Sequence, residues 1–197
     1  MHNVMKLKYG NTNTFLIRGE KGSLLIDTDY AGTLPAFYRA IKAQGMALSG
    51  ITYVLATHYH PDHMGLISSL MGQGVRLLLM ENQRGAVHFS DALFARAGLA
   101  YAPIDEEKAH VLAFSESRGF LQNLGIKGEM LPTSSHSKDG VCCLLDDGKC
   151  FVGDVEPPEF LAGYEENEPL RQDWQRIMQH HPHLIYFAHA PEKSVTE

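Results

Sequence analysis

The sequence has few cysteines, no excess of basic residues and no long apolar run. Its three cysteines, Cys142, Cys143 and Cys150, are odd in number and clustered, which is a poor basis for a disulfide framework. We interpret them as small buried residues, with Cys142 and Cys143 on opposite faces of a strand, because side chains alternate along a strand.

The charge balance excludes two classes of partner. Lysine and arginine number 17 against 23 aspartates and glutamates, a formal net charge of -6. Nucleic acids and anionic membranes attract basic patches, so neither is the expected partner. We expect a small-molecule substrate instead, and a homodimer is an open alternative to a monomer.

No segment has the length or composition of a membrane span or a signal peptide. The apolar run at residues 75–80 is interrupted by Arg76, whereas a spanning helix needs about 20 apolar residues. Residues 1–6 contain no apolar segment of the signal-peptide kind. We therefore expect a cytoplasmic protein, and a single domain over residues 1–197, because no linker or repeat divides the chain.

Strand and helix patterns alternate along the chain. Short β-rich runs predict strands at residues 14–17, 23–27, 51–56, 75–80, 129–131, 141–145, 149–152 and 184–188. Helical spacing predicts helices at residues 34–44, 64–71, 82–97, 114–124 and 169–179. The alternation indicates sheet covered by helices, but it does not name the fold.

Four local signals mark predicted element ends. Gly45 is placed to end the first helix, and Ser115 and Asn167 are placed to cap later ones. Asp147-Gly148 predicts a tight hairpin between two strands.

The unusual feature is the segment Thr57-His58-Tyr59-His60-Pro61-Asp62-His63, directly after a predicted strand. Imidazole and carboxylate groups this dense are hard to explain as packing, and together they suit zinc, iron or manganese. A solvated histidine-rich turn is the alternative. Three further candidates argue against it, because each follows another predicted strand: His136, Asp154 and His189. Strand ends are the usual edge for sites in layered α/β proteins.

This series resembles the signature of the metallo-β-lactamase superfamily: His58-x-His60-x-Asp62-His63, an isolated histidine, an aspartate after glycine and a final histidine. The resemblance runs from the strands before Asp27 to His189. It implies a four-layer αββα sandwich, two mixed β-sheets flanked by helices. It also implies that Asp27 is structural and supports the metal-binding loop.

The resemblance assigns two divalent metal ions, with zinc expected and iron or manganese as alternatives. The first ion would be held by His58, His60 and His136, the second by Asp62, His63 and His189, with Asp154 bridging both. Metal coordination lowers the pKa of water to about 7, so a metal-bridging hydroxide could act as the nucleophile. Asp62 and Asp154 are the expected catalytic carboxylates, with Asp62 orienting the hydroxide and helping to protonate the leaving group.

The sequence departs from the family pattern in two places and offers three candidates for substrate contact. Glycine commonly precedes the third and fifth histidines in the family, whereas Ser135 and Ala188 stand there. Lys138 could meet an anionic group, although a surface lysine is the alternative. Phe160 could line an apolar pocket, and Tyr164 follows Asp154 much as a substrate-contacting tyrosine does in related lactonases. The acidic loop at residues 157–168 could instead have no part in specificity.

We expect hydrolysis of a small ester, lactone or thioester. The alternatives are a phosphodiester hydrolase on the same site and a diiron redox protein. His60 argues against the redox protein, because that branch of the family typically has a carboxylate there. The remaining histidines are predicted to be solvated or to cap turns: His2, His88, His110, His180, His181 and His183.

Overall fold

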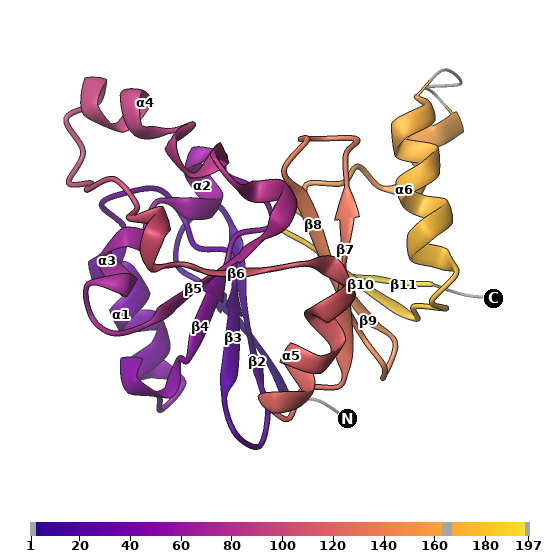
Figure 1. Ribbon diagram of the computed structural model, residues 1–197, viewed down its shortest axis with the longest axis horizontal. Helices are drawn as coiled ribbons and strands as arrows, with labels where there is room; N and C mark the ends of the chain where they lie inside the picture. The colour runs from indigo at the N-terminus through magenta and orange to yellow at the C-terminus, as the bar shows by residue number, and fades with distance from the viewer. Residues whose placement is uncertain (1–2, 163–166, 196–197) are drawn as a thin grey trace.

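The computed structural model describes residues 3–162 and 167–195, which form two β-sheets with helices on both outer faces (Figure 1). The first sheet has the order β1-β2-β3-β4-β5-β6. Its strands are β1 (Asn3–Lys8), β2 (Asn13–Arg18), β3 (Ser23–Ile26), β4 (Tyr53–Leu55), β5 (Arg76–Met80) and β6 (His110–Leu112). The pairs β1–β2 and β2–β3 are antiparallel, whereas the strands from β3 to β6 are parallel to one another, so the sheet is mixed.

The second sheet has the order β11-β10-β9-β8-β7 and is also mixed. β7, β8 and β9 are antiparallel, whereas β9 and β10 are parallel. Its strands are β7 (Gly128–Thr133), β8 (Gly140–Leu145), β9 (Lys149–Gly153), β10 (Leu184–Phe187) and β11 (Lys193–Ser194). The candidate ligands follow the C-terminal ends of four of these strands, β4, β7, β9 and β10.

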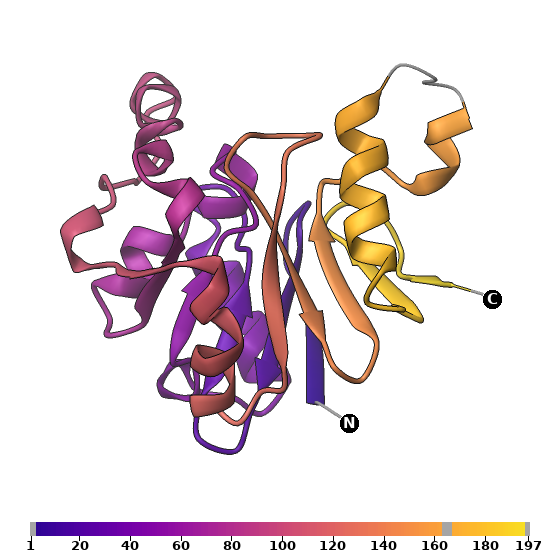
Figure 2. The same cartoon turned by 45° about the vertical axis from the view of Figure 1, so that its right-hand side comes forward.

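The helices divide between the two outer faces. The first sheet is covered by α1 (Leu34–Ala43), α2 (Pro61–Met64), α3 (Ile67–Met71) and α4 (Asp91–Arg96), and the second by α6 (Glu168–Met178), on the right in Figure 2. α5 (Ser117–Asn123) packs against β7. Short 3-10 turns are η1 (Leu48–Gly50), η2 (Glu81–Gln83), η3 (Ala86–His88), η4 (Glu106–Lys108), η5 (Phe114–Glu116) and η6 (Pro158–Ala162).

Three hydrophobic clusters separate the layers. Leu25 and Leu77 of the first sheet pack against Phe37 of α1 on the outer side. The opposite faces of both sheets meet in a middle cluster, where Phe15 contacts Phe151 with ring centroids 5.2 Å apart. Leu144, Trp174 and their neighbours form the third cluster, under α6. Alternating strand side chains thus build a helix–sheet–sheet–helix sandwich, which confirms the predicted αββα fold.

The cysteines lie as predicted. All three are free and buried, with Cys142 in the cluster under α6 and Cys143 between the sheets. Burial also raises the pKa of the Cys143 and Cys150 thiols. They therefore pack as small apolar residues and are poor nucleophiles.

Three of the local signals are confirmed. Gly45 has φ +69° after α1, and the amides of Gly45 and Met46 return to the carbonyls of Lys42 and Ile41. Asn167 accepts a hydrogen bond from the Leu170 amide at 3.1 Å, and Gly148 takes φ +78° in the β8–β9 hairpin.

Several element predictions are wrong. The helix at residues 82–97 is η2, η3 and α4 in succession, because Gly85 interrupts it with φ +76°. The helix at residues 64–71 starts earlier and divides into α2 and α3. Ser115 caps nothing, since the helix at residues 114–124 opens as a 3-10 turn in which Glu116 accepts from the Ala113 amide at 3.2 Å. The edge strands β1, β6 and β11 were not predicted, because edge strands are exposed or short.

Within the described residues, no helix has the length and apolar character that crossing a bilayer demands.

Candidate metal centre

The ligand-bearing segments converge at one end of the sandwich. Residues 57–63 follow β4 of the first sheet, whereas His136, Asp154 and His189 follow β7, β9 and β10 of the second. Gly153, just before Asp154, has φ +61°, and a Cβ there would collide with the Thr57 hydroxyl. Glycine is therefore required where the two sheets approach each other at this end.

One triad of imidazoles forms where residues 57–63 meet His136. His58 Nε2 lies 2.9 Å from His60 Nδ1, and His136 Nε2 lies 3.1 Å from the same His60 Nδ1. The three nitrogens have the spacing to contact a single ion, because one ligand atom from each residue lies within 4.8 Å of the other two.

A second triad contains Asp62, His63 and His189. The Nε2 atoms of His63 and His189 are 3.3 Å apart. His189 Nε2 lies 3.2 Å from Asp62 Oδ2, and His63 Nε2 lies 3.9 Å from Asp62 Oδ1. This group also has the spacing of a metal site.

Asp154 lies between the triads. Its Oδ2 is 3.3 Å from His63 Nε2, 3.7 Å from His136 Nε2 and 3.9 Å from His58 Nε2. Its Oδ1 is 3.4 Å from His189 Nε2. The structure thus brings together all seven residues that the sequence singled out as ligands, and His58, His63 and Asp154 form a further group with metal-site spacing that spans the two triads.

The ring nitrogens that face away from the cluster are engaged by the protein. His63 Nδ1 lies 3.2 Å from Asp27 Oδ2, His58 Nδ1 lies 3.3 Å from Thr57 Oγ1, and His189 Nδ1 lies 3.4 Å from the Asn11 carbonyl. Partners of this kind fix which nitrogen a histidine offers to an ion. Nε2 is therefore the free ligand atom in these three rings.

Asp27 also fixes the start of the loop. It is buried after β3 with φ +60°, and it accepts hydrogen bonds from the Thr57 amide at 2.6 Å and the Thr57 hydroxyl at 3.0 Å. Further along, the Tyr59 amide donates to Asp139 at 2.7 Å. The loop of residues 57–63 is therefore held by carboxylates at two points.

The electrostatics of the cluster push neighbouring groups in opposite directions. Burial, and next the charge of His63, lower the pKa of His58 to about 2. Burial acts in the same sense on His63, but Asp27 and Asp154 outweigh it and raise its pKa to about 10. Burial opposes the charged form of Asp154, yet His63 and the other histidines lower its pKa to about 2. Such opposed shifts within one cluster are typical of functional sites.

Two residues that the sequence did not single out hold the later ligands. Asp173 of α6 is buried and accepts from the amides of Ser134 and Ser135, both at 2.8 Å, next to His136. Asn13 of β2 donates its amide to the carbonyls of Phe187 and Ala190, both at 2.9 Å, on either side of His189. A charged residue on the apolar face of the predicted helix at residues 169–179 was the available signal for Asp173.

The predicted substrate contacts have different outcomes. Phe160 lines a cavity of about 410 Å³ next to the cluster, and half of its surface is exposed. Lys138 is exposed, its carbonyl accepts a hydrogen bond from the Asn82 side-chain amide at 3.5 Å, and its ammonium makes no ion pair with the residues that the structure describes. Tyr164 lies outside the described residues.

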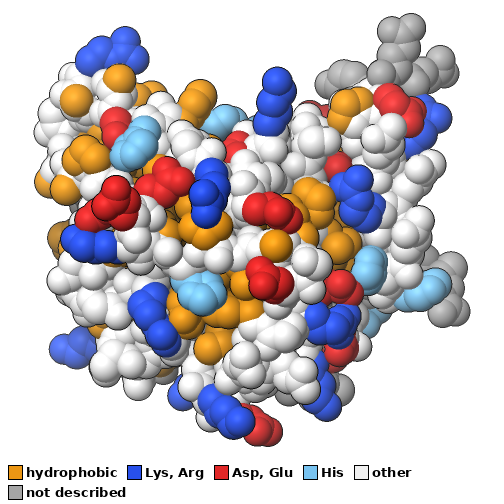
Figure 3. All heavy atoms as spheres, in the orientation of Figure 1, with side chains coloured by type: hydrophobic (Ala, Val, Ile, Leu, Met, Phe, Trp, Pro, Cys, Tyr) orange, Lys and Arg blue, Asp and Glu red, His pale blue; other side chains and the backbone are white. Residues whose placement is uncertain are grey.

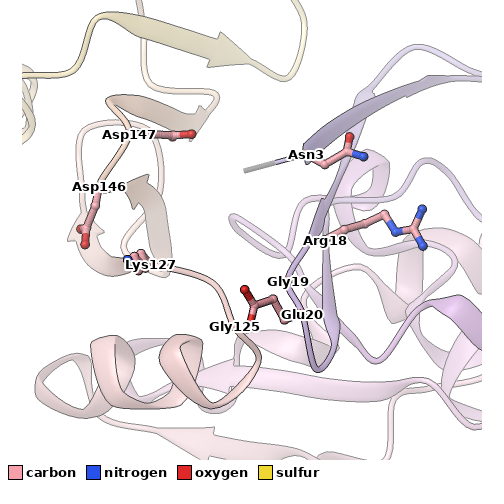
Figure 4. Close-up of a pocket in the computed structure, with 8 residues that line it drawn as sticks. All are labelled: Asn3, Arg18, Gly19, Glu20, Gly125, Lys127, Asp146 and Asp147. Carbon is pink, nitrogen blue, oxygen red and sulfur yellow. The ribbon is translucent and has the colours of Figure 1, made fainter. Parts of the chain in front are cut away.

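A larger cavity, about 820 Å³, lies at the opposite end of the sandwich (Figure 4). It is lined by Arg18 and Lys127 together with Glu20, Asp146 and Asp147. Neither histidine nor cysteine lines it, and its mixed charges select no single ligand class. Size alone therefore does not identify the candidate site.

The chain is similar in sequence to several known proteins. The family model described as the metallo-beta-lactamase superfamily matches residues 7–189. Beta-lactamase-like protein 2 homolog of Drosophila melanogaster is 25% identical over 190 residues, which cover 90% of this chain and 58% of that protein. The protein named diflavin flavoprotein A 2 of Synechocystis sp. is 34% identical over 92 residues, which cover 46% of this chain and 15% of that protein. The chain thus spans only part of the length of these relatives.

Solved structures share the fold at low identity. A metallo-beta-lactamase superfamily protein of Sulfolobus tokodaii has a TM-score of 0.69 at 18% identity, covering 98% of this chain and 82% of that one. A metallo-beta-lactamase family protein of Thermus thermophilus has a TM-score of 0.68 at 20% identity, covering 98% and 74%. With the family match along most of the sequence and the histidine–aspartate cluster at the strand ends, the chain belongs to the metallo-beta-lactamase superfamily.

Proposed function

We propose that the chain is a hydrolase that works with two divalent metal ions, zinc in the first instance, and cleaves a small ester, lactone or thioester. The observation that supports this most is the position of Asp154, whose two oxygens face ligand atoms of both triads. A carboxylate so placed could offer one oxygen to each of two ions. Members of the superfamily are generally metal-dependent hydrolases.

The chemistry of the donor set fits divalent ions. Asp154 Oδ1 is buried and makes no hydrogen bond among the described residues, so it has the unmet need of a ligand atom. Neutral imidazoles and carboxylates suit zinc, and they also accept iron and manganese. The first ion would be held by His58, His60 and His136, and the second by Asp62, His63 and His189. Asp154 would contact both.

Bound divalent ions supply a water nucleophile at neutral pH and polarise the carbonyl oxygen of the substrate. The protein contributes orientation and proton handling. Asp27 and Thr57 fix the rings of His63 and His58, so the ligand atoms need little reorganisation. The Asp62 side chain is 24% exposed at the mouth of the cluster, where its carboxylate can hold the proton that a leaving group takes up.

Metal analysis coupled to a substrate screen tests the proposal. The purified protein, loaded with zinc and freed of excess ion, should contain two ions per chain. It should hydrolyse at least one of a set of esters, lactones and thioesters faster than phosphodiesters, polynucleotides or β-lactams. A single ion at full loading, with His63 and His189 unengaged in anomalous scattering, would remove the two-metal proposal. Much faster hydrolysis of phosphodiesters than of esters, lactones and thioesters would show that the proposed substrate class is wrong.

The diiron redox alternative has one specific observation behind it, the partial match to the Synechocystis diflavin flavoprotein. It predicts iron in preference to zinc, and oxygen consumption when an external flavin reductant is supplied. The hydrolase proposal predicts neither, and His60 supplies an imidazole where that branch typically has a carboxylate. Iron content and oxygen uptake of the same preparation decide between the two.

A further inference from the structure

A cavity continues from the candidate metal centre toward η6. Three proposed ligands form its inner end: His136, Asp154 and His189. Its remaining walls are mainly apolar and include Val155, Pro157, Phe160, Phe187 and Ala190. Its volume of about 410 Å³ falls within the range of about 300–1,000 Å³ typical of small-ligand pockets.

The walls differ in how firmly they are held. Val155 and Phe187 are 3% and 5% exposed, so they belong to the core under α6. Phe160 is 50% exposed and stands at the outer end of the cavity. A large apolar side chain left half in water beside a cavity gains contact area when an apolar group enters.

Outside the proposed metal centre, the charge on the residues that line the cavity has one sign. Apart from the proposed ligands, Glu156 is the only charged residue, among those described, that lines the cavity. The Glu156 carboxylate forms no ion pair with the described residues. Residues 155–170 contain no lysine or arginine in the sequence. Lys193 reaches this segment, but it is paired with Glu159 at 2.6 Å. A carboxylate at the end of a ligand that lies away from the metal centre would therefore meet repulsion from Glu156, with no neighbouring lysine or arginine to compensate it.

We infer that this cavity holds the apolar chain of a neutral ester or thioester, with Phe160 as its outer wall and Glu156 excluding analogues that end in a carboxylate. The inference rests on the proposed function, because the chain is located relative to the metal centre. It adds the orientation of the substrate in the site and a preference for a chain end without negative charge. The substrate lies with its reacting carbonyl at the cluster and its chain toward η6.

Thiol probes test this without turnover, because a thiolate binds zinc and carries a chain of chosen length. Calorimetric titration of the zinc-loaded protein with ethanethiol, butanethiol and hexanethiol should show affinity rising roughly three- to fourfold per methylene that enters the cavity. Replacing the chain end by a carboxylate, as in 4-mercaptobutyrate against pentanethiol, should weaken binding by about tenfold or more at low salt.

Variants assign the effect to residues. Phe160→Ala should flatten the dependence on chain length while leaving ethanethiol binding unchanged. Glu156→Gln should improve the binding of 4-mercaptobutyrate several-fold, and Glu156→Lys should do so more. Met178→Ala, an exposed apolar residue at the far end of α6, is the matched control and should change neither.

Equal affinity for all chain lengths, or a Phe160→Ala variant that weakens every thiol alike, would overturn the inference and leave the hydrolase proposal intact. So would equal binding of the neutral and carboxylate-ended thiols. Failure of every thiol to bind the zinc-loaded protein would overturn both, since no metal would then be accessible beside the cavity.

Discussion

The candidate ligands fall into two groups that are held in different ways. His58, His60, Asp62 and His63 lie within one short segment, residues 57–63, which runs from the end of β4 into α2, whereas His136 and His189 follow separate strands of the second sheet. The side chains of His58 and His63 are 3% and 0% exposed, against 35% and 38% for His136 and His189. Each triad therefore combines two residues of the loop with one exposed residue.

The supports of the two groups differ as well. Residues 57–63 are held by Asp27, which directly follows β3 and binds Thr57 just beyond the neighbouring parallel strand β4, and by one long-range bond from the Tyr59 amide to Asp139. His136 and His189 depend on Asp173 and Asn13, which come from α6 and β2, far away in the sequence. The position of the buried ligands, His58 and His63, therefore depends mainly on the geometry of two adjacent strands. The position of the exposed ligands, His136 and His189, depends on a few long-range hydrogen bonds.

The largest loss of metal binding and turnover is expected at Asp154, which lies between the two triads. Asp154→Ala removes the carboxylate that faces ligand atoms of both triads, so we expect metal content to fall to at most one ion per chain. Turnover should decrease by roughly 10²–10⁴-fold, in the range of losses for a catalytic group. Metal analysis and kinetics on one preparation measure both. Full metal content with full turnover would show that the two groups do not share this ligand.

Asp27→Ala breaks the support of the loop. It leaves the Thr57 amide and hydroxyl and His63 Nδ1 without their acceptor in a buried place. We expect a loss of unfolding free energy of about 3–5 kcal/mol, as for a buried charge that loses its partner. Urea denaturation with and without zinc measures it. Asp105→Ala, at an exposed carboxylate, is the control, and equal effects of the two would contradict the proposed role of Asp27.

Asp173→Ala breaks the support of His136 alone. Two amides lose their acceptor, and His136 gains freedom while the loop of residues 57–63 is untouched. We expect affinity for one of the two ions to weaken by about 10–100-fold, as for other outer-sphere changes, and Asp173→Asn to be intermediate. Zinc titration against a competing chelator resolves the two affinities. Equal weakening of both ions would indicate a general loss of structure, and exposed Gln172→Ala should change neither.

The smallest effect is expected at Lys138. Its side chain is exposed, and the sequence offered it only as a contact for an anionic group. For a neutral ester, Lys138→Ala should change kcat/KM by less than about twofold and leave metal content unaltered. A selective rise in KM for anionic substrates would place this lysine on the outer wall of the site and would argue against a neutral substrate.

The same division explains what the sequence could predict. His58 to His63 were identifiable because their chemistry is concentrated in one segment after a β-rich run. His136, Asp154 and His189 were found as polar residues after other strands, and the family pattern grouped them. The amide of Asn13 binds backbone carbonyls of a distant loop, and no local pattern indicates it. Asp173 had one local signal, a charged residue on an apolar helix face, but that signal does not say which distant amides the carboxylate binds. Glu156 was missed because an exposed glutamate is ordinary until a cavity is seen beside it.

Element boundaries failed for a related reason. The helix predicted at residues 82–97 has suitable composition, but Gly85 adopts a left-handed conformation that the pattern of apolar residues does not encode. α2 and α3 separate at Gly65, where a Cβ would collide with the backbone around Tyr30. Within the same predicted helix, Phe89 is 70% exposed. Figure 3 shows hydrophobic side chains at the surface of the α4 region, at the upper left. Such exposure also weakens a pattern that assumes a buried face.

Because the proposed ligands come from both sheets, an ion bound among them joins the sheets as a reversible cross-link at one end of the sandwich. Folding and ion binding are then thermodynamically linked. Each tenfold increase in free ion above its dissociation constant adds about 1.4 kcal/mol to the unfolding free energy per site. The melting temperature becomes a function of ion activity, and a chelator acts as a denaturant specific to this end of the molecule.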